Sequence, residues 1–279
     1  MSLNSVNTNM GAMVALQSLQ STQQQLSVAQ KQVSTGFRVA DSSDDGAAYA
    51  IAQSIRANVG ALTSANQQLG NVQGLLSVTQ SGLNNISNTM MSMRDLLVKL
   101  SDSSVQGNDR SNYEDNYKEI LKNVHRDLED ANYNGKTLIG DLGNATGFGS
   151  VNVARNETGA TYAIGTFSGS ALYGSISGTL GTSTAVQALL TSSGTFMSMQ
   201  NKVNNQLNKV GSSINYISNQ TTYNNDKINA LNGGLGSLID ADLAKESAQL
   251  TALQIRQQLG TQALSMANQA PQSLLSLFK

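Results

Sequence analysis

The chain of 279 residues contains no cysteine, no tryptophan, a single proline and a single histidine. Without cysteine it can form no disulfide and no reactive thiolate, which fits a protein that is moved unfolded and fits many cytosolic proteins equally. His125 alone cannot build a histidine triad or a multi-histidine metal site, and we interpret it as a polar helix position. The motifs of zinc proteases, P-loop proteins and serine hydrolases are also missing. We therefore predict a protein that is not an enzyme and that binds no cofactor or metal.

Charge is scarce as well. Only 13% of the residues are charged, against about 25% in ordinary domains, and the net charge is −1 with no basic run. Nucleic acids and anionic membranes attract basic surfaces, so we expect neither as a partner. The first basic residue is Lys31 and no apolar run approaches the roughly 18 residues of a membrane span, so we expect neither a secretory signal nor a membrane helix. A surface of Asn, Gln, Ser and Thr favours close contact between many identical neighbours.

Two heptad ladders, one toward each end of the chain, are the strongest pattern that is present. The first runs at seven-residue steps through Ile55, Leu62, Leu69, Leu76, Leu83, Met90 and Leu97. The second runs at the same step through Phe196, Val203, Val210, Ile217, Asn224, Leu231 and Leu238. Chance rarely holds a heptad register for so long, so both ladders predict long helices that pack along a coiled-coil seam.

Further helices are indicated outside the ladders. Residues 12–35 are amphipathic, and Gly36 would end that helix in the left-handed conformation of a C-cap. Asp41, Asp44 and Asp45 lack the spacing of a calcium-binding loop. We interpret these aspartates as caps of a helix that contains the first ladder and runs to about residue 103.

Three more helices are expected in the rest of the chain. The third covers about residues 111–131 and turns Tyr113, Tyr117, Ile120, Val124 and Leu128 inward. The second ladder predicts a helix over about residues 195–231, ended by Asn232-Gly233-Gly234. After a break near Ile239, a last helix should end at about Asn268, before Pro271.

The middle segment, residues 132–194, has a different character. It opens with the turn signal Asn134-Gly135, glycine becomes frequent, and helical periodicity stops. Val151 and Val153 alternate with polar residues, as do Tyr162 and Ile164 after an intervening turn. This pattern predicts a β-hairpin, and so a small β-rich segment.

Together these elements predict a mainly α fold, in which the N- and C-terminal regions form a long antiparallel helical bundle or coiled coil around a small β-rich central segment. We expect a polymerisation domain (residues 1–40 and 243–279), a helical bundle (41–131 and 195–242) and an outer segment (132–194). The first of these is a pair of helices with one narrow apolar stripe each, which should gain order only beside neighbouring copies. Copies related by an operation that does not close would form an open helical polymer.

Several segments resemble bacterial flagellin, and the resemblance covers roughly residues 3–140 and 195–279. The matching motifs are specific ones, found at Leu3–Asn9, Val33–Val39, Asp44–Ala52, Tyr133–Ile139, Ile255–Thr261 and Ala267–Leu277. The resemblance implies an extracellular subunit of the helical flagellar filament, exported unfolded by the flagellar type III apparatus. It also implies contacts with other copies of the chain, with an export chaperone, and with filament cap and hook-associated proteins.

The predicted self-association residues are apolar positions of the two terminal helices, namely Leu16, Leu19, Leu26, Val33, Ile255, Leu259, Leu264, Leu274, Leu275 and Leu277. Two alternatives remain open. A hook-filament junction protein of the same axial family would share the terminal helices and the export route. A soluble helical-bundle sensor or adaptor would have no need of an apolar C-terminus.

Overall fold

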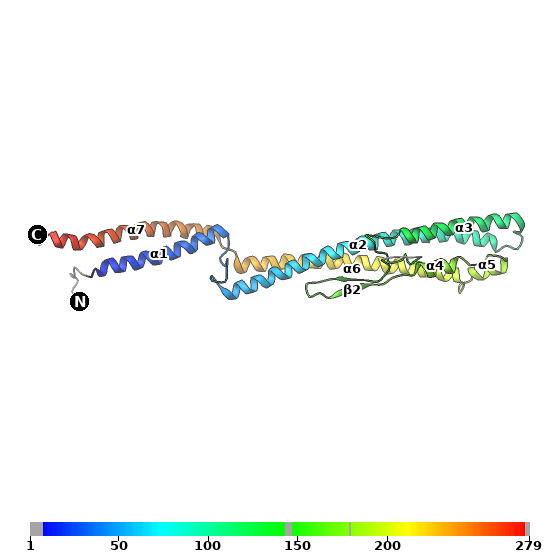
Figure 1. The fold of residues 1–279 in the computed structure, drawn as a ribbon, viewed down its shortest axis with the longest axis horizontal. Coiled ribbons are helices and arrows are strands. Elements are labelled where there is room, and N and C mark those ends of the chain that lie inside the picture. Colours follow the sequence, from blue (N-terminus) through cyan, green and yellow to red (C-terminus); the bar gives the residue numbers. More distant parts are fainter. Residues whose placement is uncertain (1–7, 143–146, 179, 277–279) are drawn as a thin grey trace. The chain divides into compact units, whose positions relative to one another are not determined.

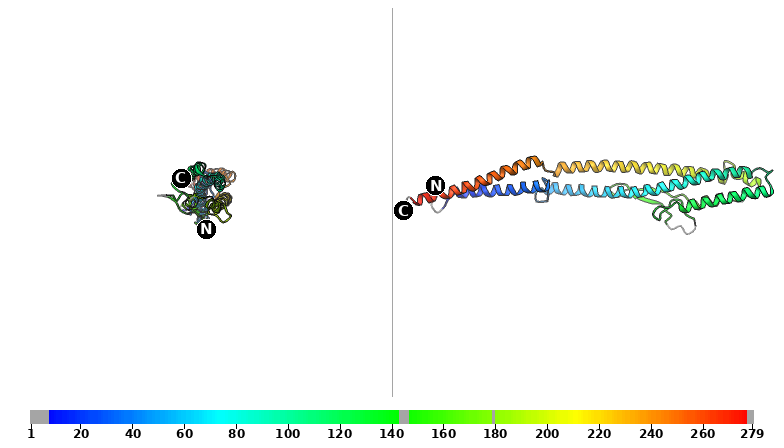
Figure 2. Two further views of the ribbon diagram at one scale, coloured as in Figure 1. Left: turned by 90° about the vertical axis from the view of Figure 1, so that its right-hand side faces the viewer. Right: turned by 90° about the horizontal axis from the view of Figure 1, so that it is seen from above.

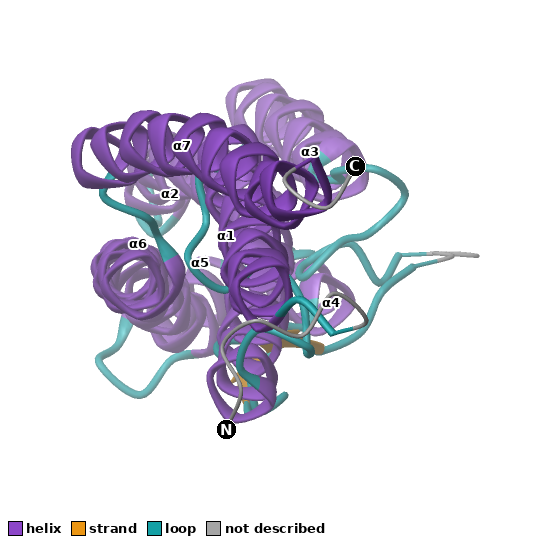
Figure 3. Cartoon of the chain, turned by 90° about the vertical axis from the view of Figure 1, so that its left-hand side faces the viewer, coloured by secondary structure: helices purple, strands orange, loops and turns teal. Residues whose placement is uncertain are grey.

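The computed structural model describes residues 8–142, 147–178 and 180–276 (Figure 1). Its elements are, in chain order, α1 (Met10–Thr35), α2 (Gly46–Leu100), α3 (Gly107–Asp130), β1 (Val151–Ala154), β2 (Thr161–Ile164), α4 (Gly169–Ile176), α5 (Ser183–Leu190), α6 (Thr195–Ile239) and α7 (Leu243–Ser276). Helices dominate, and the described strands form only one short hairpin (Figure 3). The predicted mainly α fold class is thus confirmed.

The chain divides into two compact units. The terminal unit contains the residues up to Ala57 and those from Asn229 onward, and the bundle unit contains Asn58–Ile228. The three-part division predicted from the sequence, with boundaries near residues 40, 131, 195 and 242, remains a prediction.

The core of the bundle unit is the seam between α2 and α6, which run side by side in opposite directions (Figures 1 and 2). On α2 the ladder residues from Leu62 to Leu97 are completely buried, and Ala65, Thr79 and Ile86 between them are buried too. On α6 the buried ladder residues are Phe196, Val203, Val210, Ile217 and Asn224. The heptad pattern therefore marks the helix faces that pack against the rest of the unit.

α3 packs its inward face onto this core. Tyr117, Val124 and Leu128 are buried as expected, Leu121 joins them, and Tyr113 and Ile120, also expected inward, are only partly buried. The Tyr117 hydroxyl donates to the carbonyl of Ile176 at 2.6 Å, and burial raises the pKa of this phenol. One hydrogen bond thus satisfies the polar end of a large buried side chain.

The predicted hairpin is present in the middle segment. Its strands pair antiparallel with Val151 opposite Ile164, and Val153 and Ile164 face the core. The rings of Tyr162 and Tyr216 stack at 4.1 Å and hold the hairpin against α6. The turn Asn134-Gly135 also forms, with both residues at positive φ.

The same segment contains two short helices that the sequence analysis did not predict. α4 and α5 have eight residues each, too few for a clear helical period. Their N-caps are Ser168 and Thr182, whose hydroxyls accept from the backbone N–H of Ala171 and Ala185. Leu172, Ile176 and Val186 of these helices belong to the common core, so the expected loss of helical structure between residues 135 and 190 was wrong.

Two predicted helix ends were wrong as well. α6 does not end at Asn232-Gly233-Gly234 but continues to Ile239, where Leu235, Leu238 and Ile239 pack with Val39 and Ala52. The apolar contact outweighs the low helix propensity of two glycines, about 1 kcal/mol each. α7 continues past Asn268 and through Pro271 to Ser276.

Candidate self-association surface

The terminal unit is built on the pair α1 and α7, which lie side by side (Figures 1 and 2). The contact between them is narrow. Leu26, Ala29 and Leu253 are its buried residues, with Leu250 packed against them. Close approach is helped by Gly260, since a Cβ there would lie 3.2 Å from Cδ1 of Leu19. Two helices with so few buried side chains bury little apolar area, in contrast to the bundle unit.

Side-chain amides tie the pair together along its length. Gln257 Nε2 donates to Gln23 Oε1 at 2.7 Å, and Asn9 Nδ2 donates to the carbonyl oxygen of Ala267 at 2.7 Å. Charged groups take no part in these two bonds. α1 contains one charged residue, Lys31, and α7 contains Lys245, Glu246 and Arg256.

The outward faces of the pair carry large apolar side chains among uncharged polar ones. The large exposed apolar side chains are Met10, Met13, Val14, Leu16 and Val28 on α1, and Leu243, Ile255, Leu259 and Met266 on α7. Each is at least 46% exposed. We call these residues, together with the groove described next, the outer surface of the α1–α7 pair. Where exposed apolar side chains gather into a large patch, they mark an interaction site.

A groove of about 680 Å3 runs along this outer surface. Its walls combine small and polar residues of α1 with Arg256, Leu259, Gly260 and Ala263 of α7. Small side chains on both helices leave the space open. An apolar side chain from another molecule would meet mainly uncharged atoms there.

The predicted self-association residues fall into four groups. Leu16, Ile255 and Leu259 are exposed on the outer surface, while Leu19, Val33 and Leu264 are half-buried. Leu26 is buried in the contact between α1 and α7. Leu274 and Leu275 lie in the last turns of α7, where side chains are not described, and Leu277 lies outside the described residues.

Other exposed apolar residues of the same pair are not among the predicted self-association residues. Met10, Met13 and Val14 occupy one side of the first turns of α1, at the three- and four-residue spacing that marks a helix face. Met266 follows Leu259 by seven residues, or two helical turns, and so lies on the same side of α7 as Ile255 and Leu259. This periodicity is the signal in the sequence that could have identified these exposed residues. Leu250 and Leu253 face α1 and form a separate stripe.

The two chain segments that link the terminal helices to α2 and α6 are bonded to each other. The backbone N–H of Arg38 donates to the carbonyl of Ile239 at 2.7 Å, and that of Ala241 donates to the carbonyl of Gly36 at 2.9 Å. Arg38 also donates from Nη2 to the carbonyl of Leu238 at 2.6 Å. Gly36 makes the turn possible with a φ of 74°, as predicted for a C-cap.

An ion-pair cluster stabilises the segment that follows α1. Lys31 Nζ lies 2.6 Å from Asp41 Oδ2 and 2.8 Å from Asp44 Oδ1. Hydrogen bonds from the ammonium group lower the pKa of both carboxyls and in turn raise the pKa of Lys31. The predicted helix cap is supplied by Asp45, whose Oδ1 accepts from the N–H of Ala47 and of Ala48.

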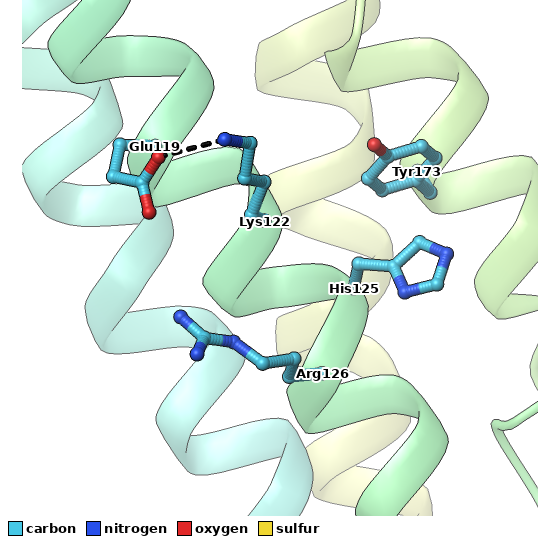
Figure 4. A pocket seen from close by; sticks show the side chains of 5 residues that line it. All are labelled: Glu119, Lys122, His125, Arg126 and Tyr173. Carbon is cyan, nitrogen blue, oxygen red and sulfur yellow. Dashed lines mark hydrogen bonds and ion pairs between the residues drawn. The ribbon is translucent and has the colours of Figure 1, made fainter.

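A second hollow, of about 420 Å3, lies on α3 and α4 (Figure 4). His125 forms part of its wall, with the ring edge against Tyr173 and with Nδ1 at 3.1 Å from Glu129. Lys122 pairs with Glu119 at 2.9 Å. Exposed ion pairs of this kind are common on helix surfaces and contribute little to stability. These contacts agree with the interpretation of His125 as a polar helix position. Among the described residues there is no cluster of three or more metal-ligating side chains, and no helix is long and apolar enough to cross a membrane.

Comparison with known proteins matches both ends of the chain to one family. The family model of the bacterial flagellin N-terminal helical region matches residues 6–142, and that of the C-terminal helical region matches residues 196–278. The flagellin FljK of Caulobacter vibrioides is 32% identical over 279 residues, with all of both chains covered. A flagellin of Brucella melitensis is 31% identical over 291 residues, covering 99% of each chain.

A more distant relative and a solved structure bear the same name. A flagellin of Listeria monocytogenes is 26% identical and covers 98% of each chain. The crystal structure of Bacillus cereus flagellin is 15% identical, covers 66% of this chain and 94% of its own, and has a TM-score of 0.38, too low to add to the sequence comparison. The resemblance seen in the sequence motifs is confirmed by full-length relatives, and the chain belongs to the bacterial flagellin family.

Proposed function

We propose that this chain is a structural subunit that polymerises into the helical flagellar filament used for motility, through the outer surface of the α1–α7 pair. One observation carries the proposal. Large apolar side chains stay exposed along both helices of a pair that contains only four charged residues.

Physical reasoning supports this use of the surface. Burying one Leu or Ile side chain contributes about 1.5–3 kcal/mol, so a repeated contact with several such residues can hold subunits together. The pair buries few residues within the chain itself. Neighbouring copies would supply the missing apolar partners, and an arrangement that does not close on itself gives a filament.

The wider setting of the chain is a further part of the proposal, and membership of the flagellin family supports it. We propose that the chain is exported unfolded by the flagellar type III apparatus with an export chaperone, and that it works outside the cell with filament cap and hook-associated proteins. The absence of cysteine is compatible with this route, because no disulfide has to form or break. A structural subunit needs neither cofactor nor catalytic site.

Seeded growth tests the proposal. Purified chain is added to sheared filament fragments and followed by electron microscopy and by the concentration of unpolymerised subunit at the end of growth. Leu259→Ser should raise this residual concentration about tenfold, because about 1.4 kcal/mol of contact is lost. Val98→Ser removes an equally exposed apolar side chain from α2, outside the pair, and is the matched control.

Four results would contradict the proposal or favour an alternative. No growth on seeds, or an equal effect of both substitutions, would contradict it. A chain that adds only to the ends of other proteins' polymers would favour the hook-filament junction role. Unchanged self-association after deletion of residues 260–279 would favour a soluble sensor or adaptor.

A further inference from the structure

Asn9 serves both helices of the terminal pair through the two ends of its side-chain amide. Its Oδ1 accepts from the backbone N–H of Ala12 at 3.0 Å and so caps the start of α1. Its Nδ2 donates to the carbonyl oxygen of Ala267 in α7 at 2.7 Å, across 258 positions of sequence. Asn9 and Ala267 are both half-buried. The cap is ordinary, but the second bond is not, because a carbonyl inside an α-helix normally accepts from the N–H four residues later.

The carbonyl of Ala267 is available because of the only proline in the chain. Four residues after Ala267 comes Pro271, whose nitrogen carries no hydrogen and cannot donate. α7 nevertheless continues through this position to Ser276. Asn9 supplies the donor that the proline lacks, and a carbonyl left unpaired in a half-buried place would instead lower the stability of the helix.

We infer that Asn9 is a positioning residue, which fixes the start of α1 against the turn of α7 that precedes Pro271. The bond sets which residues of the two helices lie at the same level. Met10 follows Asn9 and Met266 precedes Ala267, and both methionines are more than 60% exposed on the outer surface. Where this inference extends to assembly it rests on the proposed function, since correct alignment would then be needed for apolar residues of both helices to act as one contact surface.

The neighbourhood of this bond offers a direct reporter of the alignment. A Cβ built on Gly11 would lie 4.0 Å from the Cβ of Ala267. Disulfides have Cβ–Cβ distances of about 3.5–4.5 Å, and the chain has no other cysteine to compete. The double substitution Gly11→Cys with Ala267→Cys should therefore form one intramolecular crosslink in the full-length chain under mild oxidation.

Two further substitutions separate the bond to Ala267 from the cap. Asn9→Ser keeps an oxygen that can cap α1 but is too short to reach α7, so it should slow the crosslink about fivefold, the factor for one hydrogen bond. Pro271→Ala restores an N–H four residues after Ala267, and in that background Asn9→Ser should change the rate less than twofold. Seeded growth of the cysteine-free Asn9→Ser variant should leave several-fold more subunit unpolymerised than the unchanged chain does.

The outcomes test two points separately: whether Asn9 aligns α1 with α7, and whether this alignment is needed for assembly. No crosslink in the parent pair, or an equal slowing by Asn9→Ser with and without Pro271→Ala, would overturn the inferred role of Asn9. A background-dependent slowing with unchanged growth would support the contact and overturn its role in assembly. If the unchanged chain itself fails to grow on seeds, the proposed function fails, while the crosslinking rates still decide whether Asn9 aligns the helices.

Discussion

Asn224 is the one polar residue of the second ladder that is completely buried, and its replacement by alanine gives a sharp test of the bundle unit. Its Nδ2 donates to Asn66 Oδ1 on α2 at 2.8 Å and to the carbonyl of Arg155, which follows β1 in the hairpin, at 3.0 Å. Its Oδ1 accepts from Gln220 Nε2 at 2.9 Å. Asn224→Ala removes all three bonds. At about 0.5–1.5 kcal/mol each, the free energy of unfolding should fall by about 2–4 kcal/mol.

Thermal unfolding followed by circular dichroism at 222 nm measures this loss. For a unit of this size about 1 kcal/mol corresponds to about 2–4 °C, so the midpoint of the bundle transition should fall by roughly 4–16 °C. The neighbouring substitution Asn225→Ala is the control, since it removes only the exposed bond from Asn66 Nδ2 and should cost less than about 1 kcal/mol. Similar midpoints for the two variants would refute the reasoning that the buried amide joins two helices and the hairpin.

The pKa values of Asp41 and Asp44 are lowered from 3.8 by hydrogen bonds from Lys31, so their stabilisation is present above pH 3.8 and is lost as the pH falls through the lowered values. Amide exchange in residues 36–45 should therefore accelerate in acid beyond its intrinsic pH dependence, and Lys31→Gln should abolish this extra acceleration. Gly169→Ala should lower the unfolding midpoint because its Cβ would lie 2.2 Å from the carbonyl of Ile139, whereas Gly174→Ala, with open space around it, should raise the midpoint slightly. The amides of α1 and α7 should exchange quickly in the dilute subunit and slowly in filaments, and equal protection in both states would contradict the view that neighbours complete this pair.

The parts of the fold that the sequence predicted are those governed by long-range periodicity. Seven-residue spacing over many turns identifies a buried face without knowledge of the partner, as Leu62 to Leu97 show. The helix end at Gly36 was predictable because a glycine after the last helical residue commonly adopts the left-handed conformation of a C-cap. The hairpin was predictable for a similar reason, since alternating residues flank a turn.

The parts that the sequence did not predict depend on contacts with distant residues. Gly233 and Gly234 continue a helix because Leu238 and Ile239 have partners near Val39. Pro271 does not end α7. Its nitrogen has no hydrogen to donate to the carbonyl of Ala267, and Asn9, 262 positions earlier in the chain, donates to that carbonyl instead. No local pattern in the chain contains that information.

The same holds for the candidate surface. Helical spacing shows which residues of a helix share an apolar face. It does not show which of those residues contact the partner helix within the chain and which face outward. Leu26 was predicted as an intermolecular contact and lies between α1 and α7, whereas Met10 and Met13 were not predicted and are exposed. Only the pairing of α1 with α7 separates these two sets.

The near absence of ionised groups on the α1–α7 pair has a consequence for the environments in which such a contact can persist. Dissolved ions screen attraction between fixed charges, with a Debye length of about 30 Å at 0.01 M salt and about 3 Å at 1 M. A junction made of thioether, aliphatic and amide groups offers little for those ions to screen. The electrostatic part of such a contact would therefore change little between fresh water and brine.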